Sequence, residues 1–286
     1  MHIGFSTMNN LEDGRPDELG RQLEARGYES LWVGEHSHIP ASRKTPYPAG
    51  GELPTAYKRM ADMFVSLSFV AAATTRLRLG TGVALILERD VFNTAKEVAT
   101  LDRLSGGRVL FGIGTGWNQE EFENVARPPW KKRYSALEEC TRALRALWTQ
   151  EDAAFQGEWF RFDPVWSYPK PQQQPYPPVH LGVAGRVGTA HAARWAEGWM
   201  PIDIGVKDFA PRVERFRAAV REHGRDPDKV EISVFVFGDP GADRMRRYRD
   251  MGVQRVIVGG SRPNEHDPKS TLEFMDRYAA LIPELR

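Results

Sequence analysis

Short apolar runs alternate with longer amphipathic segments along most of the chain. A short apolar run bounded by glycine or polar residues is typical of a strand that is buried on both faces of a parallel sheet. The segments between the runs carry apolar residues at helical spacing, which predicts helices. The expected strands span residues 2–6, 30–34, 77–86, 108–113, 178–183, 198–202, 229–237 and 253–258.

Strict alternation of strands and helices predicts parallel strands. Eight such units in a chain of 286 residues match a closed (β/α)8 TIM barrel, which we expect to form a single domain over residues 1–286. An open, doubly wound sheet is the alternative, because periodicity does not reveal closure. It is disfavoured because no Gly-x-Gly-x-x-Gly follows the first strand.

Two insertions interrupt the alternation. A polar loop rich in proline and glycine follows the second strand, at residues 39–56, and long loops of this kind usually cover or bind something. Residues 151–178 lie between the fourth helix and the fifth strand, and the segment 155–159 in them resembles a hairpin. Between the third and fourth strands, Thr94 and Glu97 have the spacing of a capping box.

Composition narrows the class of protein. Hydrophobic residues at 41% and charged residues at 27% are typical of a globular protein, and a net charge of +1 gives no basic field for nucleic acid. No apolar stretch reaches the about 18 residues of a membrane span. The amino terminus has no signal-peptide pattern, and the single cysteine, Cys140, lies on an apolar helical face. We therefore expect a cytoplasmic protein with a packed thiol.

The carboxyl ends of the strands form the active-site face of such a barrel. These positions are rich in glycine and poor in carboxylates, which favours a flat cofactor held against backbone over acid–base chemistry by paired acids. The glycine turn from Gly114 to Gly116 is the clearest example. The predicted cofactor contacts on this face are Ser6, Thr81, Gly82, Val83, Ala84, Gly114, Thr115, Gly116 and Asn118.

A second glycine turn joins the fifth strand to a helix. Backbone amides at the amino end of a helix bind phosphate, and Arg186 adds a positive charge. An ordinary strand-to-helix turn has the same composition, so the two interpretations stand side by side. The candidate phosphate contacts are Val183, Ala184, Gly185, Arg186, Val187, Gly188 and Thr189.

His36 and His38 follow the second strand, directly after Glu35. A metal pair is disfavoured, because His180 begins its strand at the wrong face and the eighth strand ends in glycines where metal-dependent barrels have an acid. We expect His36 to donate or accept a proton beside the cofactor. A histidine that is only hydrogen-bonded at a loop start is the simpler alternative. His38, Trp117 and Asp203 are expected to shape the substrate pocket.

Several motifs in order resemble the luciferase-like monooxygenase superfamily. They are the segment at 95–118, the Arg-Tyr-x-x-Leu-Glu-Glu run from Arg133, the Ala-Leu-x-Ala-Leu-Trp run at 143–148, the proline pattern at 169–179 and the pair Gly198-Trp199. The sequence is most similar to the branch that uses the deazaflavin coenzyme F420. The resemblance covers the chain from the first strand to about residue 202 and implies a TIM barrel, with homodimers common among relatives.

The resemblance also implies details of the site. The deazaflavin ring would lie near the third strand, where the family carries a non-proline cis peptide at Gly82-Val83 or Val83-Ala84. Its phosphate would bind the turn from Val183. Glu35 and His36 match an acid–histidine pair in deazaflavin dehydrogenases, which implies that Glu35 is catalytic together with His36. A glutamate follows Gly-Thr-Gly in the sugar-phosphate branch, and Trp117 replaces it here.

These observations together predict an oxidoreductase that transfers hydride between coenzyme F420 and a small organic substrate. A monooxygenase that uses flavin mononucleotide (FMN) is the first alternative, because the glycine turns suit either cofactor. A barrel that binds a flavin or deazaflavin without turnover is the second. The sequence does not name the substrate.

Overall fold

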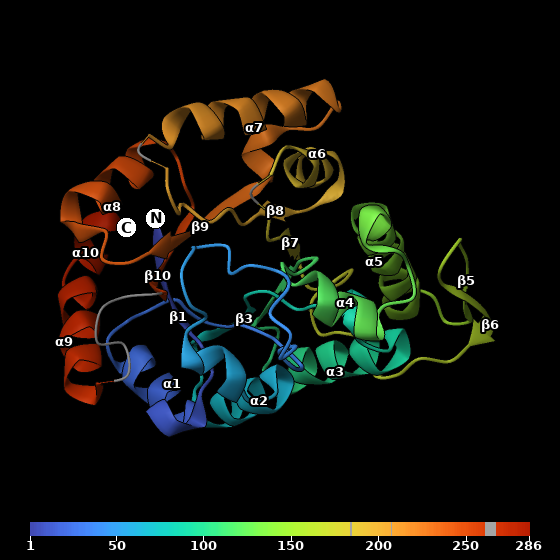
Figure 1. Ribbon diagram of the computed structural model, residues 1–286, viewed down its shortest axis with the longest axis horizontal. Coiled ribbons are helices and arrows are strands. Elements are labelled where there is room, and N and C mark those ends of the chain that lie inside the picture. The colour runs from blue at the N-terminus through green and yellow to red at the C-terminus, as the bar shows by residue number, and fades with distance from the viewer. Residues whose placement is uncertain (184, 207, 261–266) are drawn as a thin grey trace.

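The strands form a closed parallel barrel, shown in Figure 1 of the computed structural model. The structure describes residues 1–183, 185–206, 208–260 and 267–286. Around the barrel the strands follow the order β1-β10-β9-β8-β7-β4-β3-β2. Their bounds are β1 His2–Thr7, β2 Ser30–Val33, β3 Arg78–Thr81, β4 Val109–Ile113, β7 Val179–Leu181, β8 Gly198–Trp199, β9 Glu231–Phe237 and β10 Arg255–Gly260.

Helices surround the barrel and connect consecutive strands (Figure 1). The α-helices are α1 Pro16–Ala25, α2 Met63–Ala73, α3 Val91–Leu104, α4 Gln119–Val125, α5 Arg133–Thr149, α6 Arg186–Trp195, α7 Ala210–Glu222, α8 Gly241–Asp250, α9 Pro268–Ala279 and α10 Ile282–Leu285. Short 3-10 turns are η1 Leu11–Asp13, η2 Thr55–Arg59, η3 Ile86–Glu88, η4 Trp130–Lys132 and η5 Pro227–Lys229. The expected hairpin is the antiparallel pair β5 Ala153–Gln156 and β6 Arg161–Val165, which projects from the barrel (Figure 1).

The predicted (β/α)8 barrel is confirmed, but several strands are shorter than the apolar pattern indicates, and β3 and β8 are examples. β3 ends at Thr81, and the apolar residues beyond it enter the turn η3. The peptide between Gly82 and Val83 is cis, at one of the two expected positions. β8 ends at Trp199, and Ile202 makes only an isolated bridge to β9. Residues buried at the mouth of the barrel are as apolar as residues buried in a strand. Hydropathy alone therefore does not mark the residue at which a strand ends.

The capping box predicted at Thr94 is wrong. α3 begins one turn earlier, where the Asp90 side chain accepts a hydrogen bond from the backbone amide of Asn93. Thr94 lies inside the helix and donates its hydroxyl to the Asp90 carbonyl. Glu97 pairs with Arg89 and does not reach back to the helix start. Aspartate is as good an N-cap as threonine, so the two sequence signals compete within one turn.

The barrel interior is filled around Trp32, a fully buried residue of β2. A Cβ atom at Gly80 would lie 2.3 Å from the Trp32 ring, and one at Gly4 would lie 2.9 Å from its indole nitrogen. The two neighbouring strands therefore need glycine where the indole passes them. Leu110, Met200 and Ile257 complete this inner cluster. The larger apolar core lies between the barrel and its helices.

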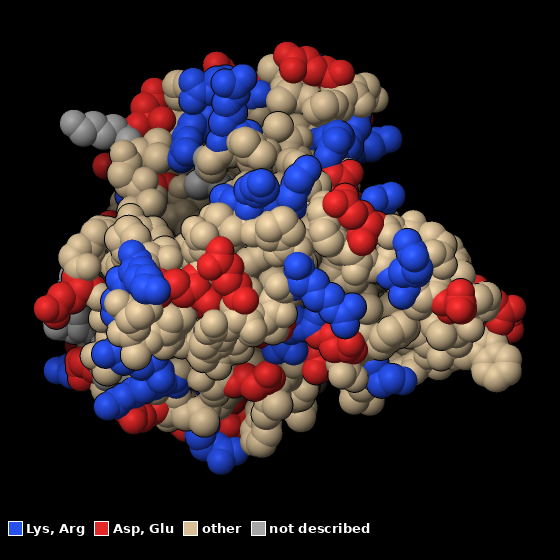
Figure 2. All heavy atoms as spheres, turned by 45° about the vertical axis from the view of Figure 1, so that its right-hand side comes forward, with Lys and Arg blue, Asp and Glu red and all other residues tan. Residues whose placement is uncertain are grey.

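Charged side chains of both signs are interspersed on the face shown in Figure 2. This agrees with the net charge of +1 and gives that face no extended field of one sign. Among the helices that the structure describes, none combines the length and the hydropathy that a membrane crossing demands.

Candidate active site

His36 lies at the mouth of the barrel, three residues after the end of β2. Its Nδ1 lies 2.5 Å from Oε2 of Glu121, and its Nε2 lies 3.1 Å from the indole nitrogen of Trp117. An indole N–H only donates, so Nε2 accepts and the ring proton lies on Nδ1, facing the carboxylate. His36 is therefore held as a neutral ring between an acid and an aromatic donor.

Glu121 is the partner that sequence reasoning missed. Its side chain is 1% exposed, and its second oxygen accepts the backbone amide of Ser37 at 3.1 Å. The helix α4 presents it, and Asn118 caps that helix by accepting the amides of Glu120 and Glu121. An N-cap residue followed by glutamate three positions later is a recognisable helix-start signal. That spacing directly after the glycine turn could have placed a carboxylate at the mouth.

The same helix fastens the long loop after β2. Glu120 accepts the Thr45 amide at 2.7 Å and a hydrogen bond from the Ser42 hydroxyl. The Asn124 amide nitrogen lies 2.9 Å from Nε2 of His38, whose other ring nitrogen lies 2.8 Å from the Ser37 hydroxyl. His38 therefore joins the loop to α4, and both of its nitrogens have partners within the chain.

Aromatic rings from this loop pack around Trp117. Tyr47, Tyr57 and His36 meet its indole edge to face, with ring centroids between 5.6 and 6.0 Å away. The guanidinium of Arg43 lies 5.8 Å from the indole centroid. Such edge-to-face contacts stabilise one arrangement of the rings. Trp117, the residue that departs from the sugar-phosphate branch, is thus the centre of an aromatic cluster that covers His36.

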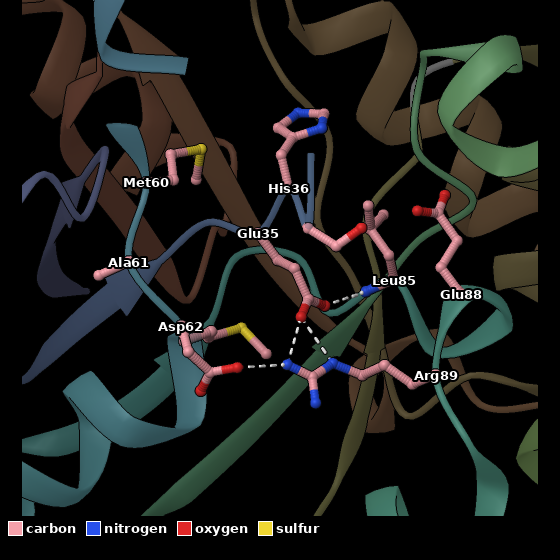
Figure 3. Close-up of a pocket in the computed structure, with 10 residues that line it drawn as sticks. Glu35, His36, Met60, Ala61, Asp62, Leu85, Glu88 and Arg89 are labelled. Atoms are coloured by element: carbon pink, nitrogen blue, oxygen red, sulfur yellow. Dashed lines mark hydrogen bonds and ion pairs between the residues drawn. The ribbon is translucent and has the colours of Figure 1, made fainter. Parts of the chain in front are cut away.

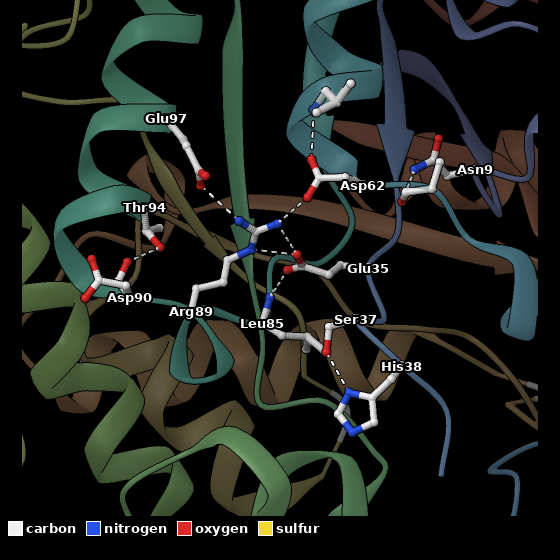
Figure 4. A network of polar contacts seen from close by, with 12 residues as sticks. Asn9, Glu35, Ser37, His38, Asp62, Leu85, Arg89, Asp90, Thr94 and Glu97 are labelled. Atoms are coloured by element: carbon white, nitrogen blue, oxygen red, sulfur yellow. Dashed lines mark hydrogen bonds and ion pairs between the residues drawn. The ribbon is translucent and has the colours of Figure 1, made fainter. Parts of the chain in front are cut away.

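Glu35 points away from His36, as Figure 3 shows, because consecutive residues of an extended segment face opposite sides. Its carboxylate accepts the Leu85 amide at 2.7 Å and the Nε of Arg89 at 2.6 Å. Arg89 also pairs with Asp62 and Glu97, as Figure 4 shows. Both oxygens of the predicted catalytic Glu35 are thus engaged, in a network that ties β2 to α2 and to α3.

A cavity of about 250 Å³ lies between His36 and the Arg89 network (Figure 3). Its lining is Glu35, His36, Ser37, Met60, Ala61, Asp62, Met63, Leu85, Glu88 and Arg89. Glu88 was not predicted either. Burial, together with the nearby carboxylates of Glu121 and Glu35, raises the pKa of Glu88 to about 9.

A protein side chain packs against the glycines at the mouth of the barrel. A Cβ atom at Gly114 would lie 2.7 Å from the side chain of Val83, and one at Gly182 would lie 2.3 Å from it. Val83 therefore fills the space that both glycines leave. Gly116 has φ +67°, a left-handed conformation that favours glycine.

Of the other predicted cofactor contacts, Thr81 and Ala84 are buried, and the Thr81 hydroxyl donates to the Gly112 carbonyl at 2.6 Å. Thr115 is also buried. Ser6 lines a second cavity, of about 280 Å³, beside α1 and α9. The residues that line this cavity do not include His36.

The expected phosphate turn leads from β7 into α6. Gly185 is the N-cap of α6 and gives it no side-chain hydrogen bond, so no described side chain caps the first turn. Arg186 and Val187 are exposed there, while Gly188 is buried against Val183. Thr189 bonds back to the Gly185 carbonyl. Ala184, also expected here, lies outside the described residues. The uncapped amides suit an anionic group.

Asp203, expected in the substrate pocket, is buried and bonded within the chain. One oxygen accepts the Phe237 amide at 3.0 Å. The other accepts the Tyr248 hydroxyl at 2.6 Å and a hydrogen bond from Arg244. The structure thus brings His36 and Trp117 together at the mouth and places Asp203 in a separate polar cluster.

Known proteins resemble this chain over half of its length or more. An uncharacterized protein of Mycobacterium tuberculosis is 39% identical over 290 residues, which cover 99% of each chain. An F420-dependent glucose-6-phosphate dehydrogenase of Kineococcus radiotolerans is 28% identical over 289 residues, 96% of this chain and 80% of the relative. An FMNH2-dependent dimethylsulfone monooxygenase of Pseudomonas putida is 32% identical over 146 residues, 50% of this chain and 40% of the relative.

Solved structures share the fold. A monooxygenase from Streptomyces bottropensis matches with a TM-score of 0.77 at 18% identity and 100% coverage of both chains. The coenzyme F420-dependent tetrahydromethanopterin reductase of Methanopyrus kandleri matches with a TM-score of 0.75 at 15% identity, over 100% of this chain and 99% of that one. The family model for luciferase-like monooxygenases matches residues 14–279. The chain therefore belongs to the luciferase-like monooxygenase family.

Proposed function

We propose that this chain is an oxidoreductase that transfers hydride between coenzyme F420 and a small organic substrate at the mouth of the barrel. The observation that carries the proposal is His36, held by Glu121 and Trp117 at the edge of a cavity. Similarity to an F420-dependent dehydrogenase over 96% of the chain supports the choice of cofactor.

The residues present fit a deazaflavin. The uncapped amino end of α6 offers backbone amides for its phosphate, and Val83 offers an apolar surface at the mouth for its ring. When bound there, the deazaflavin would supply the hydride donor or acceptor. The protein would position the substrate against the cofactor and transfer the proton.

His36 would move the proton. In the direction of substrate oxidation, a substrate hydroxyl displaces the Trp117 N–H and gives its proton to Nε2 of His36. The Glu121 carboxylate, hydrogen-bonded to Nδ1, then stabilises the imidazolium. Tyr47, Tyr57 and Trp117 exclude water from this side, which favours small apolar substrates over sugar phosphates.

Replacement of His36 tests this role. We expect His36→Ala to lower turnover with F420 about 100-fold or more, because general acid–base catalysis contributes on this scale. Cofactor affinity should stay within about threefold, since the phosphate site lies on α6. His223→Ala, at an exposed histidine after α7, is the matched control and should leave turnover unchanged. Unchanged turnover in His36→Ala would refute the assignment.

An FMN-dependent monooxygenase is the second candidate, and the 32% identity to the dimethylsulfone enzyme over half of the chain favours it. Equilibrium titration with F420 and with FMN, followed by assays of hydride transfer and oxygen uptake, separates the candidates. Tight binding of F420 without FMN supports the first proposal. Binding of FMN with oxygen uptake supports the second, and binding without turnover indicates a carrier.

A further inference from the structure

The carboxyl group of Glu88 differs from the other acids at the mouth. Glu35 and Glu121 use both of their oxygens in hydrogen bonds within the chain. Oε2 of Glu88 is buried and has no hydrogen-bond partner among the residues that the structure describes. The side chain nevertheless lines the cavity beside His36 (Figure 3).

The position of Glu88 on η3 explains why Oε2 of its carboxyl group has no partner among the described residues. Glu88 is the last residue of η3, and the left-handed Gly116 faces it, with a Cβ position 3.6 Å from Oε1. No side chain therefore separates the carboxyl from the glycine turn. A buried polar group without a partner costs about 1–3 kcal/mol, so its retention at a cavity indicates a bound partner.

The charges that face Glu88 keep it neutral. Glu121 on α4 and Glu35 after β2 are both carboxylates. Arg89 follows Glu88 in the chain, but its guanidinium is committed to Glu35, Asp62 and Glu97. The hydrogen bonds of His36 assign it the uncharged ring. Desolvation and two nearby acids thus raise the pKa of Glu88 to about 9.

We propose that Glu88 is a neutral carboxylic acid whose O–H donates a hydrogen bond to a carbonyl-type acceptor of the molecule bound in this cavity. The proposal rests on the proposed function, because the bound molecule is taken to be the cofactor or its substrate. Both sources share the same chemistry, an uncharged oxygen or ring nitrogen that accepts a hydrogen bond. A carboxylic acid that stays protonated at neutral pH can donate a hydrogen bond, whereas an ionised carboxylate can only accept one.

Two variants separate donation from shape. Glu88→Gln keeps the size and the donor but does not titrate. Glu88→Met keeps approximately the size and removes the donor. For each protein we would measure the dissociation constant of F420 and of FMN from pH 6.5 to 10.5, and the KM of the substrate. Ionisation of the cofactor itself changes its affinity for all three proteins equally. The pH dependence measured for Glu88→Gln therefore serves as the correction for the wild-type protein.

We expect wild-type affinity for the cofactor to fall about fivefold or more above pH 9, while Glu88→Gln stays flat after that correction. Glu88→Met should bind about fivefold more weakly at pH 7. If the cofactor constants are unchanged but the KM shows this pattern, the acceptor belongs to the substrate. Unchanged constants and KM in Glu88→Met would overturn the proposal.

The protonation state is tested without any ligand. The infrared difference between the wild-type protein and Glu88→Gln at pH 7 should show the carbonyl band of a protonated carboxyl, and this band should vanish at pH 10.5. A carboxylate band at pH 7 would overturn the proposal. A wild-type protein that binds neither cofactor would refute the proposed function instead, and the infrared result would still decide the state of Glu88.

Discussion

Two titratable residues with buried polar atoms, one near each end of the barrel, are held in their neutral form by surroundings of opposite charge at the two ends. His180 on β7 lies toward the amino ends of the strands, where desolvation and the charges of Arg255 and Arg78 lower its pKa to about 3. Glu88 lies at the carboxyl ends, where desolvation and two carboxylates raise its pKa. Burial penalises the charged form in both cases, and the neighbouring charges have the same sign as the group.

The difference is what surrounds each neutral group. His180 is fully buried, and a Cβ atom at Gly198 would lie 2.2 Å from its ring. The charges near it are paired, since Arg255 bonds Glu29 through two contacts of 2.8 Å and also bonds Ser233. Glu88 instead lines a cavity. Neutrality near the amino ends therefore serves packing, whereas at the carboxyl ends it leaves a donor that a ligand can use.

The largest effect on stability should come from breaking the charge cluster near the amino ends. Burial alone raises the pKa of Glu29, but hydrogen bonds and charge from Arg255 lower it below its usual value. Arg255→Met would leave that carboxylate largely buried with only the more distant Arg78, 3.8 Å away, and we expect a loss of about 3 kcal/mol in the free energy of unfolding. Chemical denaturation at pH 7 measures it. Arg246→Met, at an exposed pair with Glu284, should cause no measurable change. Equal effects in the two variants would contradict the contrast between buried and exposed pairs.

Glu88→Gln should change the free energy of unfolding by a smaller amount and in the opposite direction. The folded-state pKa of Glu88 is raised, so its contribution to stability is fully present below its unfolded pKa near 4.5 and is lost as the pH rises through about 9. At pH 7 the glutamine variant should therefore be more stable than the wild type by about 2–3 kcal/mol. The two proteins should converge below pH 4.5. Thermal or urea unfolding at several pH values checks this, and a constant difference would show that Glu88 does not titrate with a shifted pKa.

The smallest expected effect concerns His180 in acid. Its folded-state pKa is lowered, so its contribution is present above its unfolded pKa near 6.5 and is lost as the pH falls toward 3. Relative to pH 7, the wild type should lose about 1–2 kcal/mol at pH 5 that His180→Gln does not lose. The slope of stability against pH is the measurement, because the substitution also changes packing. Parallel slopes would indicate that His180 is not held neutral.

Much of the site was accessible from the sequence where a local pattern marked it. The glycine turn at 114–116, the histidine after β2 and the helix start at Gly185 were each visible as a short motif at a strand end. Glu121 was not identified although the spacing from Asn118 marks a helix start there, because acids in helical segments usually face solvent. Glu88 was not identified because no local pattern distinguishes it. The partners of Glu35 and Asp203 could not be predicted from the sequence either. Arg89 lies 54 positions from Glu35, and Tyr248 lies 45 positions from Asp203.

The alternation of strands and helices, and the parallel barrel that it implies, follow from the amino-acid pattern alone, because periodicity records which positions are buried. The family resemblance follows from the sequence as well. The ends of β3 and β8, and the packing of Val83 into the space left by Gly114, became visible only in the folded chain, which also decided the contacts at the mouth. There His36 faces Glu121, while Glu88 has no partner among the described residues. These outcomes depend on contacts between segments far apart in the chain, and local pattern carries no record of such contacts.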